Sequence, residues 1–228
     1  MKVNWVAIIL IIIVVFLLYY ILYNFFVNKT TIYKQTYLGN GVPSVPLGDM
    51  SGIGNKQYSF DLWVYVNNVK GASGPSTFGS NNPKGNLFFM GDLNNSYLSV
   101  DLFNDGSAEV NFSANGPKLL ITKNFPLQRW EHIIINVNNS LIEIYLDGKL
   151  IRSLKSPTPP ATPTVNSSIF FGTGDIFIAQ LHRNLFLYDA NLAYNTYIKG
   201  NNGYRVTPYS ATFSLLKNNE PTYNYQIW

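Results

Sequence analysis

Cysteine is absent from all 228 residues, which excludes a disulfide scaffold and any metal site built on thiolates. The lack of cysteine is compatible with a reducing compartment but does not require one. Charged residues make up only 12% of the chain, with 16 Lys and Arg against 12 Asp and Glu. The basic residues are scattered rather than gathered in a run, so the composition gives no support to nucleic acid as a partner.

Charge is missing altogether from residues 5–23, where every side chain is apolar or aromatic. At about 1.5 Å per residue, a helix over residues 5–27 would measure roughly 34 Å and would cross a hydrocarbon core of about 30 Å. We therefore expect residues 1–28 to form a single-pass transmembrane anchor in contact with a lipid bilayer. The side chains assigned to this anchor, with aromatic rings towards its ends, are Trp5, Ile12, Tyr19, Tyr20, Tyr23 and Val27.

A cleaved signal peptide is the alternative reading of this apolar segment. A signal peptide has an apolar region of about 7–15 residues followed by small residues at the cleavage site. Here the apolar run is longer, and residues 25–29 (Phe-Phe-Val-Asn-Lys) offer no such site, so we expect the segment to be retained. Lys2 on one side is balanced by Lys29 and Lys34 on the other, which leaves the orientation in the membrane open.

Past Gly48 the chain turns to a period of two, most clearly over residues 58–66, where apolar and polar residues alternate as in a half-buried strand. Turn signals at Asn104-Asp105-Gly106 and Asp147-Gly148 separate some of these segments, and Asp189 and Gly200 are suited to begin and end a short helix over 190–199. The expected strands are 58–66, 87–90, 97–103, 109–114, 119–122, 130–137, 141–146, 149–154, 169–171 and 176–187.

This pattern predicts an all-β fold, an antiparallel two-sheet jelly-roll sandwich, behind the N-terminal helix. We expect the sandwich at residues 50–200, a juxtamembrane linker at 29–49 and an aromatic C-terminal tail at 201–228. The segment 67–84, rich in Gly, Ser, Asn and Pro, is expected to be a loop, as is the proline-rich segment 156–164.

Three stretches of the expected sandwich resemble the laminin G-like branch of the concanavalin A-like lectin/glucanase superfamily. They are residues 58–64 (Tyr-Ser-Phe-Asp-Leu-Trp-Val), the hairpin over 130–149, and residues 176–192. The resemblance implies an antiparallel sandwich, and its superfamily includes lectins, glucanases and interaction modules, so it does not by itself give the function. The residues that carry the family signature are Trp63, Trp130, His132, Tyr145, Asp147 and Gly148.

The carboxylates do not follow the pattern of a hydrolase. A retaining glucanase needs two carboxylates about 5–5.5 Å apart, whereas Glu109, Glu131 and Glu143 each stand alone on a different expected strand. His132 and His182 are the two histidines, and the resemblance implies that His132 packs on the sheet rather than acts in catalysis. We therefore expect that the protein is not an enzyme and has no catalytic residues.

No cofactor is expected, with calcium as the alternative. The resemblance implies that a calcium ion is often bound at the rim of such a sandwich by Asp side chains and carbonyl oxygens, the ligands that calcium prefers. Asp92, Asp101 and Asp105 are the local candidates. All three also occur at expected turns, where Asp commonly bonds to its own backbone.

Aromatic residues reach 15% of the chain, and those of the tail show no clear periodicity. We expect the tail to bind protein neighbours, such as a coat or capsid protein, through Tyr209, Phe213, Tyr223, Tyr225 and Trp228. The function expected is a structural protein that ties a protein shell to a bilayer, of the minor capsid type found in large DNA viruses with an inner membrane. The alternative is a membrane-tethered, lectin-like protein that binds glycans.

Overall fold

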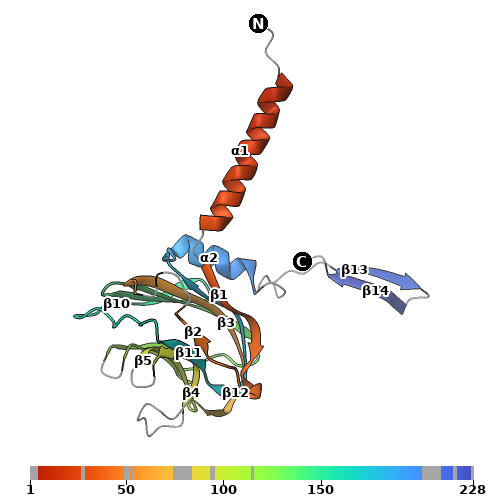
Figure 1. Ribbon diagram of the computed structural model, residues 1–228. Helices are drawn as coiled ribbons and strands as arrows, with labels where there is room; N and C mark the ends of the chain where they lie inside the picture. Colours follow the sequence, from red (N-terminus) through yellow and green to blue (C-terminus); the bar gives the residue numbers. More distant parts are fainter. Residues whose placement is uncertain are drawn as a thin grey trace.

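The computed structural model describes residues 5–26, 29–48, 52, 54–73, 84–92, 96–113, 116–201, 212–217 and 220–226. The chain folds into a helix, a sandwich of two β-sheets and a separate β-hairpin (Figure 1). The sandwich confirms the predicted fold class of an all-β, antiparallel, two-sheet domain.

Sheet A has six strands in the order β1-β12-β3-β8-β9-β10, and all neighbours are antiparallel. Sheet B has six strands in the order β2-β11-β4-β5-β6-β7, also antiparallel. In chain order the strands are β1 (Lys29–Tyr37), β2 (Val45–Pro46), β3 (Gln57–Ser73), β4 (Lys84–Gly91), β5 (Ser96–Phe103), β6 (Ala108–Asn111), β7 (Lys118–Thr122), β8 (Trp130–Asn138), β9 (Leu141–Leu146), β10 (Lys149–Lys155), β11 (Ser168–Phe171) and β12 (Thr173–Asn184).

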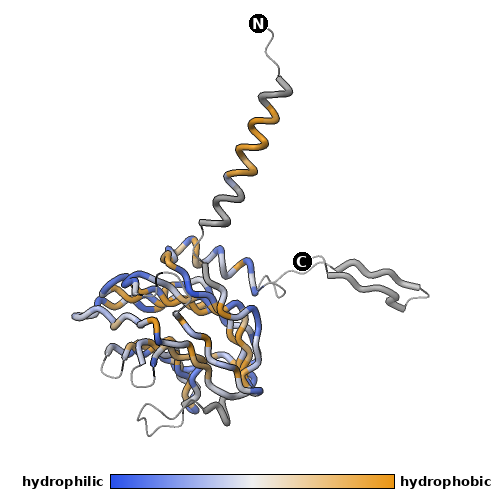
Figure 2. Tube along the Cα trace, in the orientation of Figure 1, coloured by the Kyte–Doolittle hydropathy of each residue, from blue (hydrophilic) through white to orange (hydrophobic). Residues whose placement is uncertain are grey.

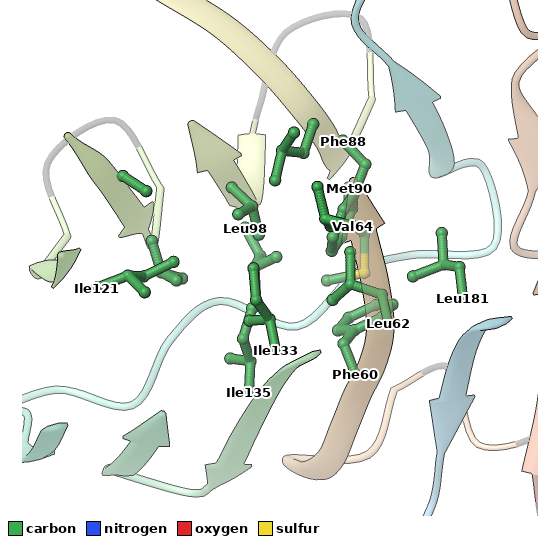
Figure 3. Packing of buried hydrophobic residues seen from close by; sticks show 14 of the residues in the cluster. Phe60, Leu62, Val64, Phe88, Met90, Leu98, Ile121, Ile133, Ile135 and Leu181 are labelled. Atoms are coloured by element: carbon green, nitrogen blue, oxygen red, sulfur yellow. The ribbon is translucent and has the colours of Figure 1, made fainter. Parts of the chain in front are cut away.

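One hydrophobic core lies between the two sheets (Figure 3). Alternate residues of each central strand point into it because successive side chains of a strand face opposite sides. On β3 these are Phe60, Leu62, Val64 and Val66, all of which are fully buried. The residues between them face outward, so the outer face of sheet A carries the polar and aromatic side chains considered below.

The short helix α2 (Ala190–Lys199) covers part of the outer face of sheet A. Its bounds agree with the prediction. The Asp189 carboxylate accepts a hydrogen bond of 2.7 Å from the backbone N–H of Leu192 at the start, and Gly200 ends the helix with a φ of 72°. A second cluster of buried residues, Ile134, Tyr145, Tyr188 and Ala193, joins the helix to the sheet.

Three segments differ from the sequence-based expectation. Residues 29–49, expected as a linker, contribute β1 and β2 to the two sheets, and β3 continues to Ser73 into the segment expected as a loop. The tail, for which no strands were predicted, contains the hairpin β13 (Thr212–Lys217) and β14 (Glu220–Gln226). In each case strand pairing with a distant or following segment stabilises residues whose own pattern is weak.

The helix α1 (Trp5–Phe26) occupies the apolar N-terminal segment. It stands clear of the sandwich, and its described middle part is strongly hydrophobic (Figure 2). Every side chain from Ile9 to Tyr19 is between 45% and 70% exposed. Nevertheless, within the described residues no helix has both the length and the apolar character of a membrane span. The predicted helix is therefore present, but its assignment as a transmembrane anchor is not supported.

Candidate functional site

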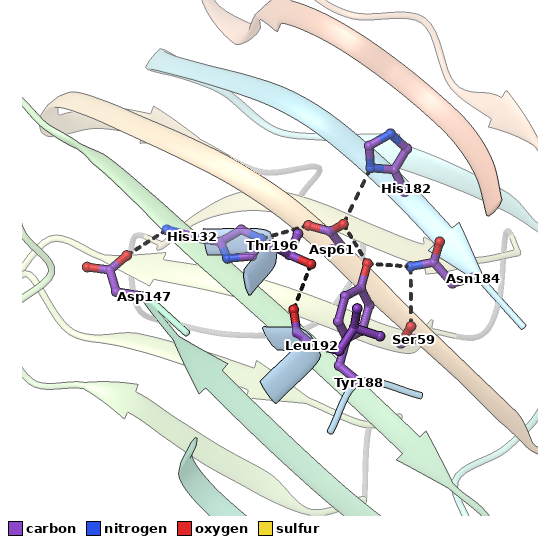
Figure 4. Close-up of polar contacts among 9 residues, drawn as sticks. All are labelled: Ser59, Asp61, His132, Asp147, His182, Asn184, Tyr188, Leu192 and Thr196. Atoms are coloured by element: carbon purple, nitrogen blue, oxygen red, sulfur yellow. Dashed lines mark hydrogen bonds and ion pairs between the residues drawn. The ribbon is translucent and has the colours of Figure 1, made fainter. Parts of the chain in front are cut away.

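A network of buried polar side chains lies on the outer face of sheet A, beneath the segment that leads into α2 (Figure 4). At its centre is Asp61 of β3. One carboxylate oxygen lies 2.8 Å from Nε2 of His132, and the other accepts a 2.7 Å hydrogen bond from the hydroxyl of Tyr188. His182 Nδ1 lies 3.6 Å from the same oxygen as Tyr188. Burial and the nearby Asp61 carboxylate raise the pKa of Tyr188, so its hydroxyl remains a donor.

Two amides hold the same segment against the sheet. The side chain of Asn136 accepts a 3.1 Å hydrogen bond from the backbone N–H of Tyr188 and donates one of 2.7 Å to its carbonyl. Asn184 donates to the hydroxyls of Ser59 and Tyr188, each at 3.3 Å. These contacts fix the turn from β12 to α2 and therefore place the helix on the sheet.

The network has the residue types of a catalytic site but not its accessibility. His132 is fully buried, stacks on Trp63 with ring centroids 4.7 Å apart, and is covered by Tyr197 of α2 at 6.3 Å. Asp61, Tyr188 and His182 are also buried, at 1%, 3% and 7% exposure. The His132 ring is thus packed between Trp63 and the Asp61 carboxylate, the kind of position that the resemblance implies for it.

The residues of the family signature come together in sheet A and its β9–β10 turn. Two hydrogen bonds join His132 and Asp147. The backbone N–H of His132 donates to the Asp147 carboxylate at 2.9 Å, and the backbone N–H of Asp147 donates to the carbonyl of His132 at 2.8 Å. Asp147 and Gly148 have φ angles of 49° and 74°, as the predicted tight turn requires. Tyr145 is buried against α2, and Trp130 begins β8.

A charged cluster that the sequence did not predict lies beside this turn. Glu131, at the start of β8, is fully buried and pairs with Arg129, which also reaches Asp147 at 3.3 Å. Burial raises the pKa of Glu131 to about 7, against the effect of Arg129, and the Asp147 carboxylate contributes to the rise. Only the register of β3 and β8, which places Glu131 opposite the buried Val64, indicates that this acid is enclosed.

The three glutamates considered for hydrolysis lie apart. Glu109 is on β6 of sheet B, whereas Glu131 and Glu143 are on β8 and β9 of sheet A. Glu143 is opposite Asn136, five residues along β8 from Glu131, which corresponds to a separation of roughly 16 Å at about 3.3 Å per residue. Glu131 and Glu143 therefore do not have the spacing of a retaining glycosidase, and Glu109 belongs to the other sheet.

The three calcium candidates are also separated. Asp92 follows β4 at one end of β5 and accepts a hydrogen bond from Tyr97, whereas Asp105 lies in the turn at the other end and binds Ser107. Asp101 is buried within β5 and accepts hydrogen bonds from Ser99 and Asn111. In the part of the chain that the structure describes, no group of three His, Asp or Glu side chains is arranged to hold a metal ion.

A row of four aromatic side chains crosses sheet A at one end of its outer face. Tyr37, Phe177, Tyr65 and Trp130 are directly paired on the neighbouring strands β1, β12, β3 and β8. Successive ring centroids lie 4.6, 6.2 and 5.6 Å apart, and all four side chains are half-buried. We call these residues the aromatic row. Sequence reasoning missed it because the pairing that aligns the four rings joins strands that are far apart in the chain.

The remaining predicted site residues are only partly described. Ile12 and Tyr19 lie on α1 and are 51% and 66% exposed. Trp5, Tyr20 and Tyr23 are on α1 by position, and Phe213, Tyr223 and Tyr225 are on the hairpin, where Phe213 is paired with Tyr225. The predictions for Val27, Tyr209 and Trp228 lie outside the described residues.

Residues 39–180 match the family described as the concanavalin A-like lectin/glucanases superfamily. The match covers more than half of the chain, so the protein belongs to this superfamily, as the resemblance of the three stretches implied. Membership establishes the sandwich architecture and a lectin-like fold. No curated protein matches the sequence.

The solved structures that the chain matches include receptor-binding domains of botulinum neurotoxins. The binding domain of neurotoxin DC in complex with rat synaptotagmin II has 15% identity and a TM-score of 0.49, over 64% of this chain and 36% of that one. The serotype D ligand-binding domain in complex with N-acetylneuraminic acid has 12% identity and a TM-score of 0.48, over 64% and 37%. The chain thus corresponds to little more than a third of each of these proteins.

Proposed function

We propose that the protein is a non-enzymatic tether, in which α1 inserts into a lipid bilayer and the sandwich beside it binds a partner. The observation that carries this proposal is the run of apolar side chains from Ile9 to Tyr19, each at least 45% exposed. Exposed apolar surface is costly in water, and a helix is the form in which an apolar segment satisfies its backbone within lipid. The residues from Trp5 to Tyr23 include no charge that would oppose insertion.

The partner in this proposal is a protein neighbour in a large assembly, such as a coat or capsid shell held to an inner membrane. The separate hairpin of the tail supports this part of the proposal. A two-stranded hairpin is at best marginally stable alone in water and gains stability from a surface to pack on. The absence of enzymatic activity is part of the same proposal, and the separated glutamates and the buried His132 support it.

A glycan is the second candidate partner. The lectin-like fold gives a general reason, and the aromatic row gives a specific one, because half-exposed aromatic rings on a sheet can stack on sugar rings.

Alkaline carbonate extraction of membranes that contain the full-length chain tests the tether. We expect the protein to stay in the membrane pellet, and the double variant Ile12→Arg/Phe16→Arg to move to the supernatant. Each Arg costs about 2.5–3.5 kcal/mol near the centre of a membrane helix. The variant Leu150→Arg, at an exposed apolar residue of β10, is the matched control and should stay in the pellet. Recovery of the unaltered protein in the supernatant would refute the proposal.

A further inference from the structure

The aromatic row lies just beyond the area that α2 covers. Trp63 and His132 lie two residues from Tyr65 and Trp130 on strands β3 and β8. Both are fully buried and are stacked under Tyr197 of α2. Tyr65 and Trp130 are the next outward-facing residues on the same two strands, and they are only half-buried. Tyr197 of α2 therefore stacks over Trp63 and His132, whereas the side chains of the row keep part of their surface exposed.

The spacing of the row follows the sheet rather than a local motif. Its four members occupy adjacent strands, which lie about 4.8 Å apart, so the row presents one ring per strand. Neighbouring planes are inclined by 32°, 76° and 57°, from Tyr37 to Trp130. The surface is thus ridged. It does not suit the flat face of a crystalline polysaccharide, but it suits a single chain whose successive sugar rings turn relative to one another.

Polar groups border one end of the row. The hydroxyl of Tyr37 donates a 3.3 Å hydrogen bond to one oxygen of Asp175, and the side-chain amide of Asn67 donates a 2.6 Å hydrogen bond to the other. Asn67 is exposed and Asp175 partly exposed, so both remain within reach of a ligand. Carboxylate and amide groups beside aromatic rings match the two sides of a sugar, its hydroxyl groups and its apolar C–H face.

We propose that the aromatic row, with Asp175 and Asn67, is a binding site for an extended, uncharged oligosaccharide chain that lies across strands β1, β12, β3 and β8. The inference rests on the second candidate of the proposed function and specifies its site and ligand. Charge favours a neutral ligand over a phosphate-bearing one. The acid at the border is Asp175, and Arg129, which precedes Trp130, is already paired with Glu131 and Asp147.

Isothermal titration calorimetry tests this site. The full-length chain in detergent micelles is titrated with cellohexaose, chitohexaose and mannohexaose. We expect at least one hexasaccharide to bind, and Trp130→Ala and Tyr65→Ala each to weaken binding by about tenfold or more, equivalent to about 1.4 kcal/mol. Trp130→Phe retains a ring and should recover most of the affinity. Tyr194→Ala is the matched control, because Tyr194 is a 51% exposed aromatic residue on α2, outside the row.

The row could instead serve only to stabilise the sheet through cross-strand packing. In that case Trp130→Ala and Tyr65→Ala would lower the melting temperature, and none of the three hexasaccharides would bind the unaltered chain. That result, or an equal loss of binding in Tyr194→Ala, would overturn the inference. The two proposals fail separately. If the protein stays in the carbonate pellet but binds no sugar, only the oligosaccharide site is refuted. If the protein binds sugar but leaves the pellet, only the membrane tether is refuted.

Discussion

The hydroxyl of Tyr188 donates a 2.7 Å hydrogen bond to the buried carboxylate of Asp61. The two residues are 127 positions apart in sequence, and their contact joins the central strand β3 to the segment that leads into α2. Because the pKa of Tyr188 is raised, the bond is retained across the range of pH in which the protein would be handled. It makes Tyr188 the direct link between the sheet and its covering helix.

Replacing Tyr188 with Phe should therefore destabilise the fold. The change removes a hydrogen bond to a charged group, which typically contributes about 1.5–3 kcal/mol. We expect a corresponding fall in the free energy of unfolding, measured by chemical denaturation. The control Tyr194→Phe alters a tyrosine that is 51% exposed and should change stability by less than about 0.5 kcal/mol. Equal effects of the two variants would contradict the role given to Tyr188.

Stability should fall as the pH rises, because of Glu131. Its pKa is raised from 4.5 to about 7, so the folded protein holds a proton that the unfolded chain has lost over this interval. The free energy of unfolding then decreases from about pH 4.5 to about pH 7 and levels off above it. At about 1.4 kcal/mol per pKa unit, the total contribution is of the order of 3–4 kcal/mol.

The variant Glu131→Gln isolates this contribution. Glutamine cannot ionise, so the variant should be more stable than the parent at pH 8 and should show a flatter profile between pH 5 and pH 8. Thermal unfolding at a series of pH values measures both effects. A steeper profile in the variant, or stability that rises with pH in the parent, would be inconsistent with the assignment.

Substitution of Gly148 by Ala should show how tightly α2 packs on the β9–β10 turn, with Gly106 as the control because it also has a positive φ. A Cβ at Gly148 would lie 2.8 Å from the Cα of Tyr194, whereas at Gly106, with a φ of 85°, nothing lies within 4 Å. Gly106→Ala should cost about 1–2 kcal/mol from backbone strain alone. Gly148→Ala should cost at least about 1 kcal/mol more, because α2 must shift. Faster hydrogen exchange of α2 amides in Gly148→Ala only would confirm the cause.

Deletion of residues 208–228 should separate folding from partner binding. Among the strands that the structure describes, β13 and β14 form a sheet of their own and pair with neither sheet A nor sheet B. We therefore expect the melting temperature of the sandwich to be unchanged, while a coat or lattice protein that co-purifies with the full chain is lost. A large fall in melting temperature would show instead that the hairpin supports the sandwich.

Local signals were enough to predict several elements. The strand β9 and the helix α2 have the predicted bounds, because Asp147-Gly148 takes the positive φ of a tight turn and Asp189 caps the helix through its own carboxylate. Among the residues that the resemblance names, His132 is part of the buried network and Trp63 stacks on it. In these places the residues that define the structure are neighbours in sequence.

Contacts between distant segments were not predictable in the same way. The strand β1 is rich in Thr, Lys and Gln, and it belongs to the sandwich because it pairs with β12, from Lys29 opposite Asn184 to Tyr37 opposite Phe177. The aromatic row and the burial of Glu131 likewise depend on register, which the sequence pattern alone does not define. These are the features from which the candidate site is built.

The position of β1 determines how mechanical load would pass through the molecule. The strand begins three residues after α1 ends, and its last residue, Tyr37, is a member of the aromatic row. Tension between a bilayer that holds α1 and a ligand bound on the row would run lengthwise along β1. The hydrogen bonds to β12 lie across that direction, so they would bear the load together in shear rather than open one at a time.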